Sequence, residues 1–483
     1  MKFKHILSLS VLWTSQTTLA TLTPSLERGD RNVYYTSPRG VSEVCVIPKH
    51  FPEAKYTESD LKIENKLCSL NFYSETNSAS TNEANAVAIC PKLNSTNPGV
   101  DIFSIPGVDK LNKSDSNYLE ELTKLKSDFE KINCEDKTDS AEKIGKYKNS
   151  TSCSYAPSLL AYYHVSRILG GIGNVPPAVL RSMDIQTHKS LASKALSITK
   201  SSKVNDLASQ PLIYQTWYSL NNFLNAGLNG SKKDQLLSDD GQQSYGAVII
   251  NPKGEEFYKE FFTAGADRAL AFKDKNDVFK LVKNSISIEG IIGSAPINQT
   301  SLQKMIAMQD VTEFILLDHI LDQQDRFGNI AFQTVTAYLK EKENGEVELE
   351  RTKKMEKYEE DKKQGQALSE AFSVKAMVLK DNDCGVSKEN RIKAAGLLKE
   401  ISHMNPDTYN RLLDFSQTVR TPEAAKFFKS NMMLTTTDYN EMVANIDDAV
   451  KILKSNCQSG KLKLDLDIAT YFTKGPVTNW SCE

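Results

Sequence analysis

The chain has 483 residues, of which 40% are hydrophobic and 25% are charged, and this composition suits one large or two medium globular domains. Its formal net charge is -2, so it has no long-range positive field to attract nucleic acid, and we expect no nucleic-acid partner. Any acidic ligand must therefore be held by a local site.

The first twenty residues have the layout of an export signal. Lys2 and Lys4 precede an apolar run at residues 6–13, and small and polar residues follow as far as Ala20. This run is too short to cross a bilayer, and no later segment reaches the ~20 apolar residues that a spanning helix needs. We expect cleavage after Ala20 and an exported protein, periplasmic or secreted, without a membrane span.

All eight cysteines follow this signal, and an even number in an exported chain predicts disulfides. Metal binding by these thiols is disfavoured, because no two cysteines have the short spacing that lets them share one tetrahedral ion. Connectivity cannot be read from sequence, so several pairings stay open. Three pairs of sequence neighbours would close loops of sensible size: Cys68 with Cys90, Cys134 with Cys153, and Cys457 with Cys482.

Residues 21–180 predict a small, mostly β lobe. Short extended stretches occur at residues 86–90 and 100–103, within a region rich in turn-forming residues. Leucines at helical spacing predict an amphipathic helix at residues 118–129. A second helix is predicted at residues 157–170, because its apolar residues follow a helical period and it ends in two glycines.

Residues 181–483 predict a mainly helical lobe with one buried strand at residues 245–250 and one hairpin around Asn344-Gly345. The charged run at residues 340–363 mixes both signs, which favours a solvated surface over a partner-binding one. The fold class that we predict is therefore α+β. Helices are expected at residues 189–197, 212–224, 311–321, 392–404, 407–418, 422–431 and 439–453.

The most informative segment is residues 314–330, where an apolar helical run meets a polar turn. Phosphoryl transfer needs a carboxylate to position or deprotonate the acceptor hydroxyl, and an oxygen ligand for a metal ion that bridges the phosphates. Asp325 and Asn329 provide both within one turn, although they are four positions apart and such loops commonly place them five apart. The alternative is structural, with Asp322 and Asp325 ending a helix and capping the next turn.

A second acidic turn, Asp381-Asn382-Asp383, ends a strand-like apolar run. Two carboxylates at one place suit a Mg or Mn ion, so we expect Asp381 to hold the metal and Asp383 to assist. An Asx turn is the alternative. The order of the two motifs favours the functional interpretation, because kinase-like enzymes place a strand-ending Asp after a turn that contains Asp, Arg and Asn.

Residues 160–184 resemble a stretch of the secretory-pathway kinases of the four-jointed and Golgi casein kinase type. The resemblance covers residues 143–383 and extends loosely to phosphatidylinositol kinases, and the two acidic motifs are its most specific parts. It implies a bilobal protein-kinase-like fold in which Asp325 is catalytic and Asp381 binds the metal. The matching positions of the first stretch are Arg167, Leu169, Val175, Pro176, Pro177 and Arg181.

The same resemblance places a phosphate-contacting lysine just before the helix at residues 157–170. Lys148 is the first candidate and Lys146 the second, and the alternative is that both are plain surface lysines. Members of the family orient this lysine with a Glu from the following helix.

That helix has no acidic residue here, and Leu159 falls at the aligned position of the Glu. An acid from the earlier helix, Glu120 or Glu121, is the alternative source of the missing carboxylate.

Taken together, these features predict a metal-dependent kinase that transfers the ATP γ-phosphoryl group to a hydroxyl of an extracytoplasmic protein or glycan. The nucleotide is ATP, the metal is Mg or Mn, and the backbone of residues 245–250 contacts adenine. The absent Glu leaves two alternatives: a pseudokinase that serves as a nucleotide-binding or partner-binding scaffold, and an AMP transferase on the same fold. The sequence does not specify an oligomeric state.

Overall fold

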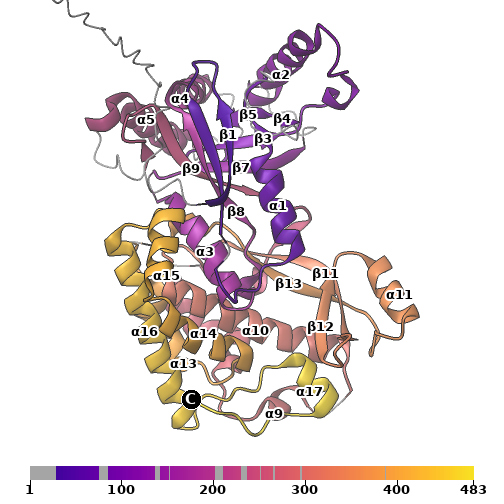
Figure 1. Ribbon diagram of the computed structural model, residues 1–483. Helices are drawn as coiled ribbons and strands as arrows, with labels where there is room; N and C mark the ends of the chain where they lie inside the picture. Colours follow the sequence, from indigo (N-terminus) through magenta and orange to yellow (C-terminus); the bar gives the residue numbers. More distant parts are fainter. Residues whose placement is uncertain are drawn as a thin grey trace, which may run out of the picture.

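The structure is a computed structural model that describes residues 29–49, 51–74, 85–135, 142–151, 153–201, 210–229, 236–250, 252–264, 267–293, 296–386 and 388–483. The expected export signal lies outside these residues. Within them, no helix combines the length and the apolar character needed to cross a membrane. The described chain is a mixed α and β structure, with an antiparallel sheet next to a mainly helical part (Figure 1).

Seven antiparallel strands form the larger sheet, which lies in the upper part of Figure 1. The predicted extended segments at residues 100–103 and 245–250 are confirmed as strands of this sheet. The one at residues 86–90 is confirmed in part, because residues 88–90 lie in this sheet while Ala86 belongs to a separate short strand. The first two strands of the sheet were not predicted. In spatial order the strands are β1 (Gly29–Thr36), β2 (Ser42–Pro48), β8 (Ala178–Asp184), β9 (Gln243–Ile250), β7 (Lys143–Asn149), β6 (Gly99–Phe103) and β5 (Ala88–Pro91).

Strand β9 lies between β7 and β8 and pairs with both. Its backbone groups are therefore used within the sheet, and the expectation that residues 245–250 contact adenine through their backbone is wrong for this paired stretch. The expected division between lobes near residue 180 falls inside β8. Any two-lobe description must therefore group β8 and β9 with the N-terminal part.

Within the described residues, four helices accompany the larger sheet, and two short strands, β3 (Leu70–Asn71) and β4 (Asn85–Ala86), pair in parallel as a separate small sheet. The three helices predicted here at residues 118–129, 189–197 and 212–224 are confirmed within longer ones. The four helices are α1 (Glu58–Cys68), α2 (Tyr118–Glu135), α4 (Ile185–Lys200) and α5 (Gln210–Ala226).

Helix α3 (Ala156–Ile168) confirms the helix predicted at residues 157–170, and every one of its residues is buried. A helix that is buried on all sides needs apolar or internally satisfied side chains around its whole circumference. Its apolar residues belong to the same hydrophobic core as those of the C-terminal helices. This helix therefore links the larger sheet to the helical part.

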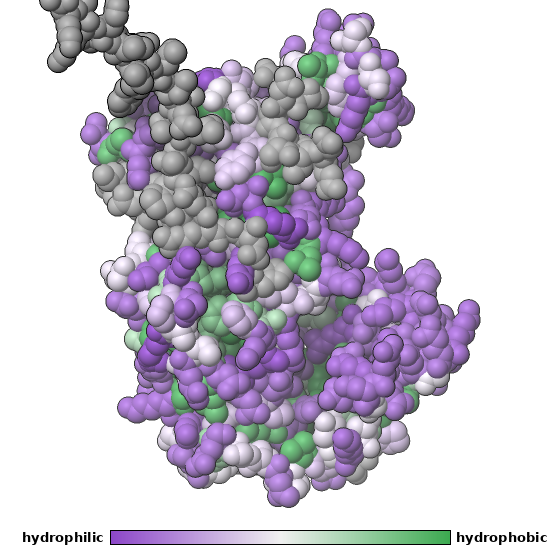
Figure 2. Space-filling view, in the orientation of Figure 1, coloured by the Kyte–Doolittle hydropathy of each residue, from purple (hydrophilic) through white to green (hydrophobic). Residues whose placement is uncertain are grey.

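A second sheet is built on the long strand β11 (Ile330–Glu341). β13 (Phe372–Leu379) pairs with one edge of β11, while β10 (Glu255–Phe257) and β12 (Val347–Thr352) pair with the other. The predicted hairpin is thus confirmed as β11 and β12. Helix α11 (Met355–Lys363) follows, and hydrophilic residues cover this projection in Figure 2, as expected for the charged run at residues 340–363.

The helical part surrounds α10 (Gln299–Ile320), which is buried along most of its length. The single helix predicted at residues 392–404 is wrong: α12 (Arg391–Ala395) ends at Gly396, whose φ of 67° lies in the left-handed region that terminates helices. The remaining helices are α7 (Arg268–Lys275), α8 (Asp277–Val282), α9 (Ile288–Ile292), α13 (Leu397–Glu400), α14 (Pro406–Thr418), α15 (Pro422–Lys426), α16 (Thr436–Gln458) and α17 (Ile468–Lys474).

Four disulfides pair all eight cysteines, as expected for a protein of an oxidising compartment. Only the predicted pairing of Cys457 with Cys482 is confirmed. The other two predicted pairs are wrong, because strand and helix packing brings different cysteines together. The observed pairs are Cys45–Cys68, Cys90–Cys134 and Cys153–Cys384.

Asp310 of α10 is a buried carboxyl group whose Oδ2 accepts a hydrogen bond from the Met377 amide at 3.1 Å. Burial raises the pKa of Asp310 to about 7, despite the opposing charge of Arg351. An unfolded Asp titrates near 4, so between about pH 4 and pH 7 the folded state holds a proton that the unfolded state has lost. This group therefore lowers the stability of the protein as pH rises through that window.

We expect Asp310→Asn, which cannot ionise, to gain stability relative to the wild type by up to about 4 kcal/mol between pH 4 and pH 8. Urea unfolding of both proteins across this pH range measures the difference. Asp274→Asn, an exposed change on α7, serves as the control and should show no such trend. A constant difference between Asp310→Asn and the wild type at all pH values would contradict the expected burial effect.

Candidate active site

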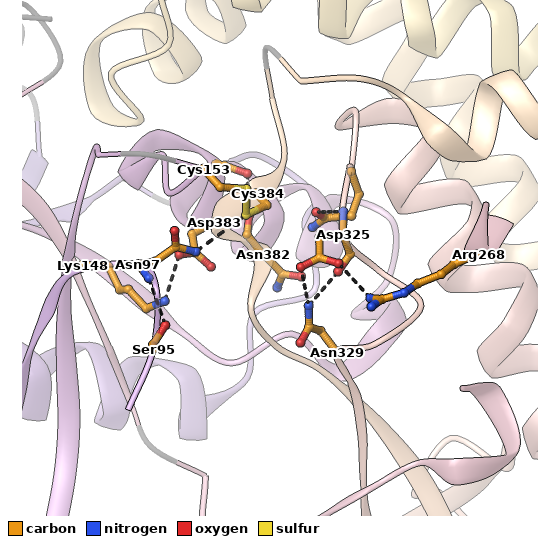
Figure 3. The surroundings of a disulfide bond; sticks show 12 residues. Ser95, Asn97, Lys148, Cys153, Arg268, Asp325, Asn329, Asn382, Asp383 and Cys384 are labelled. Carbon is orange, nitrogen blue, oxygen red and sulfur yellow. Dashed lines mark hydrogen bonds and ion pairs between the residues drawn. A yellow bond between two sulfur atoms is a disulfide. The ribbon is translucent and has the colours of Figure 1, made fainter. Parts of the chain in front are cut away.

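The first acidic turn follows the C-terminus of α10. Asp325 is exposed there. Asn329 Nδ2 donates hydrogen bonds to the backbone oxygen of Asp325, at 2.8 Å, and to Asp325 Oδ2, at 3.1 Å. Arg268 of α7 forms an ion pair with the other carboxylate oxygen at 3.3 Å (Figure 3). Asp325 is thus oriented from two sides while half of its side chain stays accessible to an acceptor.

The neighbouring Asp322 has a structural role. It is buried, and its Oδ1 accepts hydrogen bonds from Asn390 at 2.6 Å and Asn445 at 2.8 Å. Burial raises the pKa of Asp322 to about 6, although these hydrogen bonds oppose the rise. The helix-ending alternative therefore describes Asp322, which ties the turn to α16.

The second acidic turn begins two residues after β13. Asp381 has a φ of 53°, a left-handed conformation that Asp adopts more readily than most residues. The two residues that follow are anchored to α3 and its N-cap: Ser158 Oγ donates to the Asn382 carbonyl at 2.6 Å, and the Tyr155 amide donates to the Asp383 carbonyl at 2.8 Å. Asp381 is left half-buried at the edge of this turn.

Arg326 joins the two acidic turns. Its guanidinium forms a bidentate ion pair with Asp318 of α10, at 2.8 and 2.9 Å. The same group donates to the Lys380 carbonyl at 2.9 Å and to Asn382 Oδ1 at 2.7 Å. Tyr162 of α3 completes the network by donating to Asp318 at 2.7 Å. Because a bidentate guanidinium fixes direction as well as distance, the residues next to Asp325 and Asp381 are held against each other.

Lys148, on β7, forms a buried ion pair with Asp383. Its Nζ lies 2.8 Å from Asp383 Oδ2, and each side chain is 3% exposed. Burial would raise the pKa of Asp383, but the charge of Lys148 lowers it to about 2. Burial likewise acts to lower the pKa of Lys148, and the carboxylates of Asp383 and Asp381 more than offset this effect. Both groups therefore stay charged.

This ion pair bears on the Glu that α3 lacks. Glu120 and Glu121 are exposed on the first turn of α2, and the ion pair of Lys148 is with Asp383 instead. Leu159 is buried in α3, as an apolar residue at this position should be. The carboxylate that orients Lys148 thus comes from the second acidic turn.

Lys146 lies two positions before Lys148 on β7 and therefore on the same face of the sheet. It is half-buried, and burial together with the charge of Lys143 lowers its pKa. A third lysine of this face, Lys92, was missed by sequence reasoning. The Pro98-Gly99 pair marks a turn after β5, but no local pattern in the sequence singles out this lysine.

The metal that the motifs imply can be tested against the donors present. Among the described residues, no group of three His, Cys, Asp or Glu side chains is placed to hold an ion. Mg and Mn do not need such a group, because one or two carboxylates suffice when substrate phosphates and water complete the shell. Asp381 is half-buried, and the Asn329 amide turns its Nδ2 toward Asp325, so its carbonyl oxygen points away from that carboxylate. These hard oxygen donors fit a divalent cation.

A cavity of about 320 Å³ borders Asp325 and is lined also by Arg268, Arg391 and Cys153. The disulfide Cys153–Cys384 lies beside it and joins the segment after β7 to the second acidic turn, across 231 positions of sequence. Figure 3 shows Lys148 and Asp383 on one side of Asn382, with Asp325 and Arg268 on the other. The disulfide thus holds in place the part of the site that carries the Lys148–Asp383 ion pair.

No protein-family model matches this chain, and no curated protein matches it. Among solved structures, it is similar to the crystal structure of the Golgi casein kinase with Mn/ADP bound. The similarity has a TM-score of 0.35 and 10% sequence identity, and it covers 76% of this chain and 71% of that chain. Identity at this level does not transfer a function, so the residues of the site must carry it.

Proposed function

We propose that this chain is an exported, metal-dependent kinase that transfers the γ-phosphoryl group of ATP to a hydroxyl of an extracytoplasmic protein or glycan. The observation that carries this proposal is the buried Arg326 network, which holds the Asp325 turn against the Asp381-Asn382-Asp383 turn. The Lys148–Asp383 ion pair stands at the same turn. The proposed base Asp325, the proposed metal-binding carboxylate Asp381 and the proposed phosphate-binding cation Lys148 lie on three segments that are distant in sequence. These contacts link the three segments.

Each residue has a distinct role in this proposal. Asp325 orients or deprotonates the acceptor hydroxyl, since its carboxylate is half exposed and faces a cavity. Lys148 contacts the nucleotide phosphates, with Lys146 as the second candidate. Asp381 and Asn329 hold the divalent metal, and Asp383 assists while it orients Lys148.

When bound, the metal would neutralise charge on the phosphate oxygens. The chain itself contributes positioning, because its charged groups are fixed by hydrogen bonds before substrate arrives. Fixed charges of this kind need little reorganisation during the reaction. The four disulfides and the signal-like N-terminus support an exported location for this activity.

We expect the full chain to transfer label from γ-labelled ATP to itself or to water in the presence of Mn, and excess chelator should abolish this transfer. Mass spectrometry of the incubated protein distinguishes an added phosphate from an added AMP. Binding of ATP without turnover would identify a scaffold instead, and an added AMP would identify an AMP transferase. Either result would overturn the kinase proposal.

A further inference from the structure

Lys92 follows β5 directly and faces the start of the next strand. Its backbone amide donates to the Gly99 carbonyl at 2.9 Å, which closes the hairpin between β5 and β6. In the adjoining pair of strands, Gly99 stands opposite Lys148. Lys92 and Lys148 therefore flank Gly99 from the two neighbouring strands.

Gly99 allows these two lysine side chains to meet. A Cβ atom at this position would lie 3.7 Å from Lys148 Cδ and 3.9 Å from Lys92 Cδ. Both aliphatic chains thus pass over the bare backbone of Gly99. A larger side chain would stand between them and would also press on the Tyr147 carbonyl, 3.1 Å from the Cβ.

Among the described residues, little negative charge is placed to match Lys92. Lys92 is 7% exposed, and burial lowers its pKa to about 7, with further lowering by the charges of Lys148 and Lys146. Asp381 and Asp101 act in the opposite direction. Asp101, however, already forms an ion pair with Lys143 at 2.7 Å.

Three lysines, Lys92, Lys146 and Lys148, therefore share this face with the two carboxylates of Asp381 and Asp383. A divalent cation on the acidic turn would increase the surplus of positive charge. An anion with several negative oxygens would favour the charged form of these lysines, and an ammonium group can bind it through charge-assisted hydrogen bonds.

We propose that Lys92 is a second phosphate-binding lysine, which grips the polyphosphate chain of the nucleotide together with Lys148 across Gly99. This inference rests on the proposed nucleotide-binding function and adds a residue to it. It also explains why the hairpin between β5 and β6 carries a glycine at the position opposite Lys148.

Calorimetric titration of the full chain with a non-hydrolysable ATP analogue, AMP and inorganic tripolyphosphate tests this proposal. We expect Lys92→Met to weaken the binding of the ATP analogue and of tripolyphosphate by roughly 10-fold to 100-fold, and to change the affinity for AMP far less. Lys126→Met is the control, because Lys126 is a half-buried lysine of the same part of the chain, and its ammonium is held by Glu130 at 2.5 Å. This control should bind all three ligands like the wild type.

Equal affinity of Lys92→Met and the wild type for the ATP analogue would overturn the role of Lys92 and leave the kinase proposal standing. Gly99→Ala provides a second variant. A loss of affinity for tripolyphosphate in this variant would support the proposal that Lys92 and Lys148 bind the phosphates together over the backbone of Gly99. If the wild type binds tripolyphosphate but no nucleotide, Lys92 and Lys148 still form a polyphosphate site and the kinase proposal fails. Failure of the wild type to bind any of these ligands would overturn both.

Discussion

Asp325→Asn should reduce the rate of phosphoryl transfer by roughly 100-fold to 10,000-fold and leave the affinity for nucleotide nearly unchanged. The asparagine keeps the shape of the side chain and loses the negative charge that accepts or orients the acceptor proton. Affinity is preserved because the phosphates are expected at Lys148 and Asp381, and Figure 3 shows Lys148 on the far side of Asn382 from Asp325. Single-turnover transfer from γ-labelled ATP, beside calorimetric binding of the non-hydrolysable analogue, measures both quantities.

The matched control for this variant is Asp274→Asn, which makes the same charge change at an exposed position of α7. It should transfer phosphate at the wild-type rate. The ion pair of Asp325 with Arg268 is half exposed, so its loss should cost little stability. Wild-type turnover in Asp325→Asn would remove this residue from the catalytic role.

Asp381→Asn should abolish the effect of the divalent metal on nucleotide binding. In the wild type we expect Mn to strengthen binding of the ATP analogue, because Asp381 would hold the metal and the metal would neutralise charge on the phosphates. The variant loses a charged ligand, so its affinity in Mn should fall by at least about 10-fold, toward the value measured in chelator. Calorimetric titrations with Mn and with chelator provide the comparison.

Asp383→Asn tests the ion pair that positions Lys148. Breaking a buried ion pair leaves an uncompensated charge and typically costs about 3 to 5 kcal/mol. The melting temperature of Asp383→Asn should therefore fall clearly, whereas that of Asp381→Asn, with its half-buried side chain, should change little.

An unchanged response to Mn in Asp381→Asn would contradict its assignment as a metal ligand.

Local sequence patterns predicted the elements whose signals are local. The apolar periods of α3 and α10 and the hairpin of β11 and β12 were readable, because periodicity and turn residues act within a few positions. The break at Gly396 was overlooked, although a glycine within a helical pattern is a recognised stop signal. Strands β1 and β2 were overlooked too, although both are rich in strand-forming Val, Tyr and Ile, and Pro38 and Gly40 lie in the turn between them.

Features that depend on tertiary packing could not be obtained in this way. The disulfide between Cys153 and Cys384 spans 231 positions, and no local rule selects it over pairs of sequence neighbours. Lys92 joined the candidate site only once the pairing of β6 with β7 placed Gly99 opposite Lys148. The order of the acidic motifs suggested their proximity, but the guanidinium of Arg326 that links them emerged from the structure alone.

The central claim is that the Asp325 turn and the Asp381 turn serve one divalent cation and one nucleotide. A crystal structure of the full chain with Mn and a non-hydrolysable ATP analogue tests it most directly, since Mn can be located by its anomalous scattering. We predict Mn within bonding distance of Asp381 and Asn329, with the phosphates against Lys148 and the γ-phosphate facing Asp325. Mn and nucleotide bound elsewhere, with this site empty, would contradict the account.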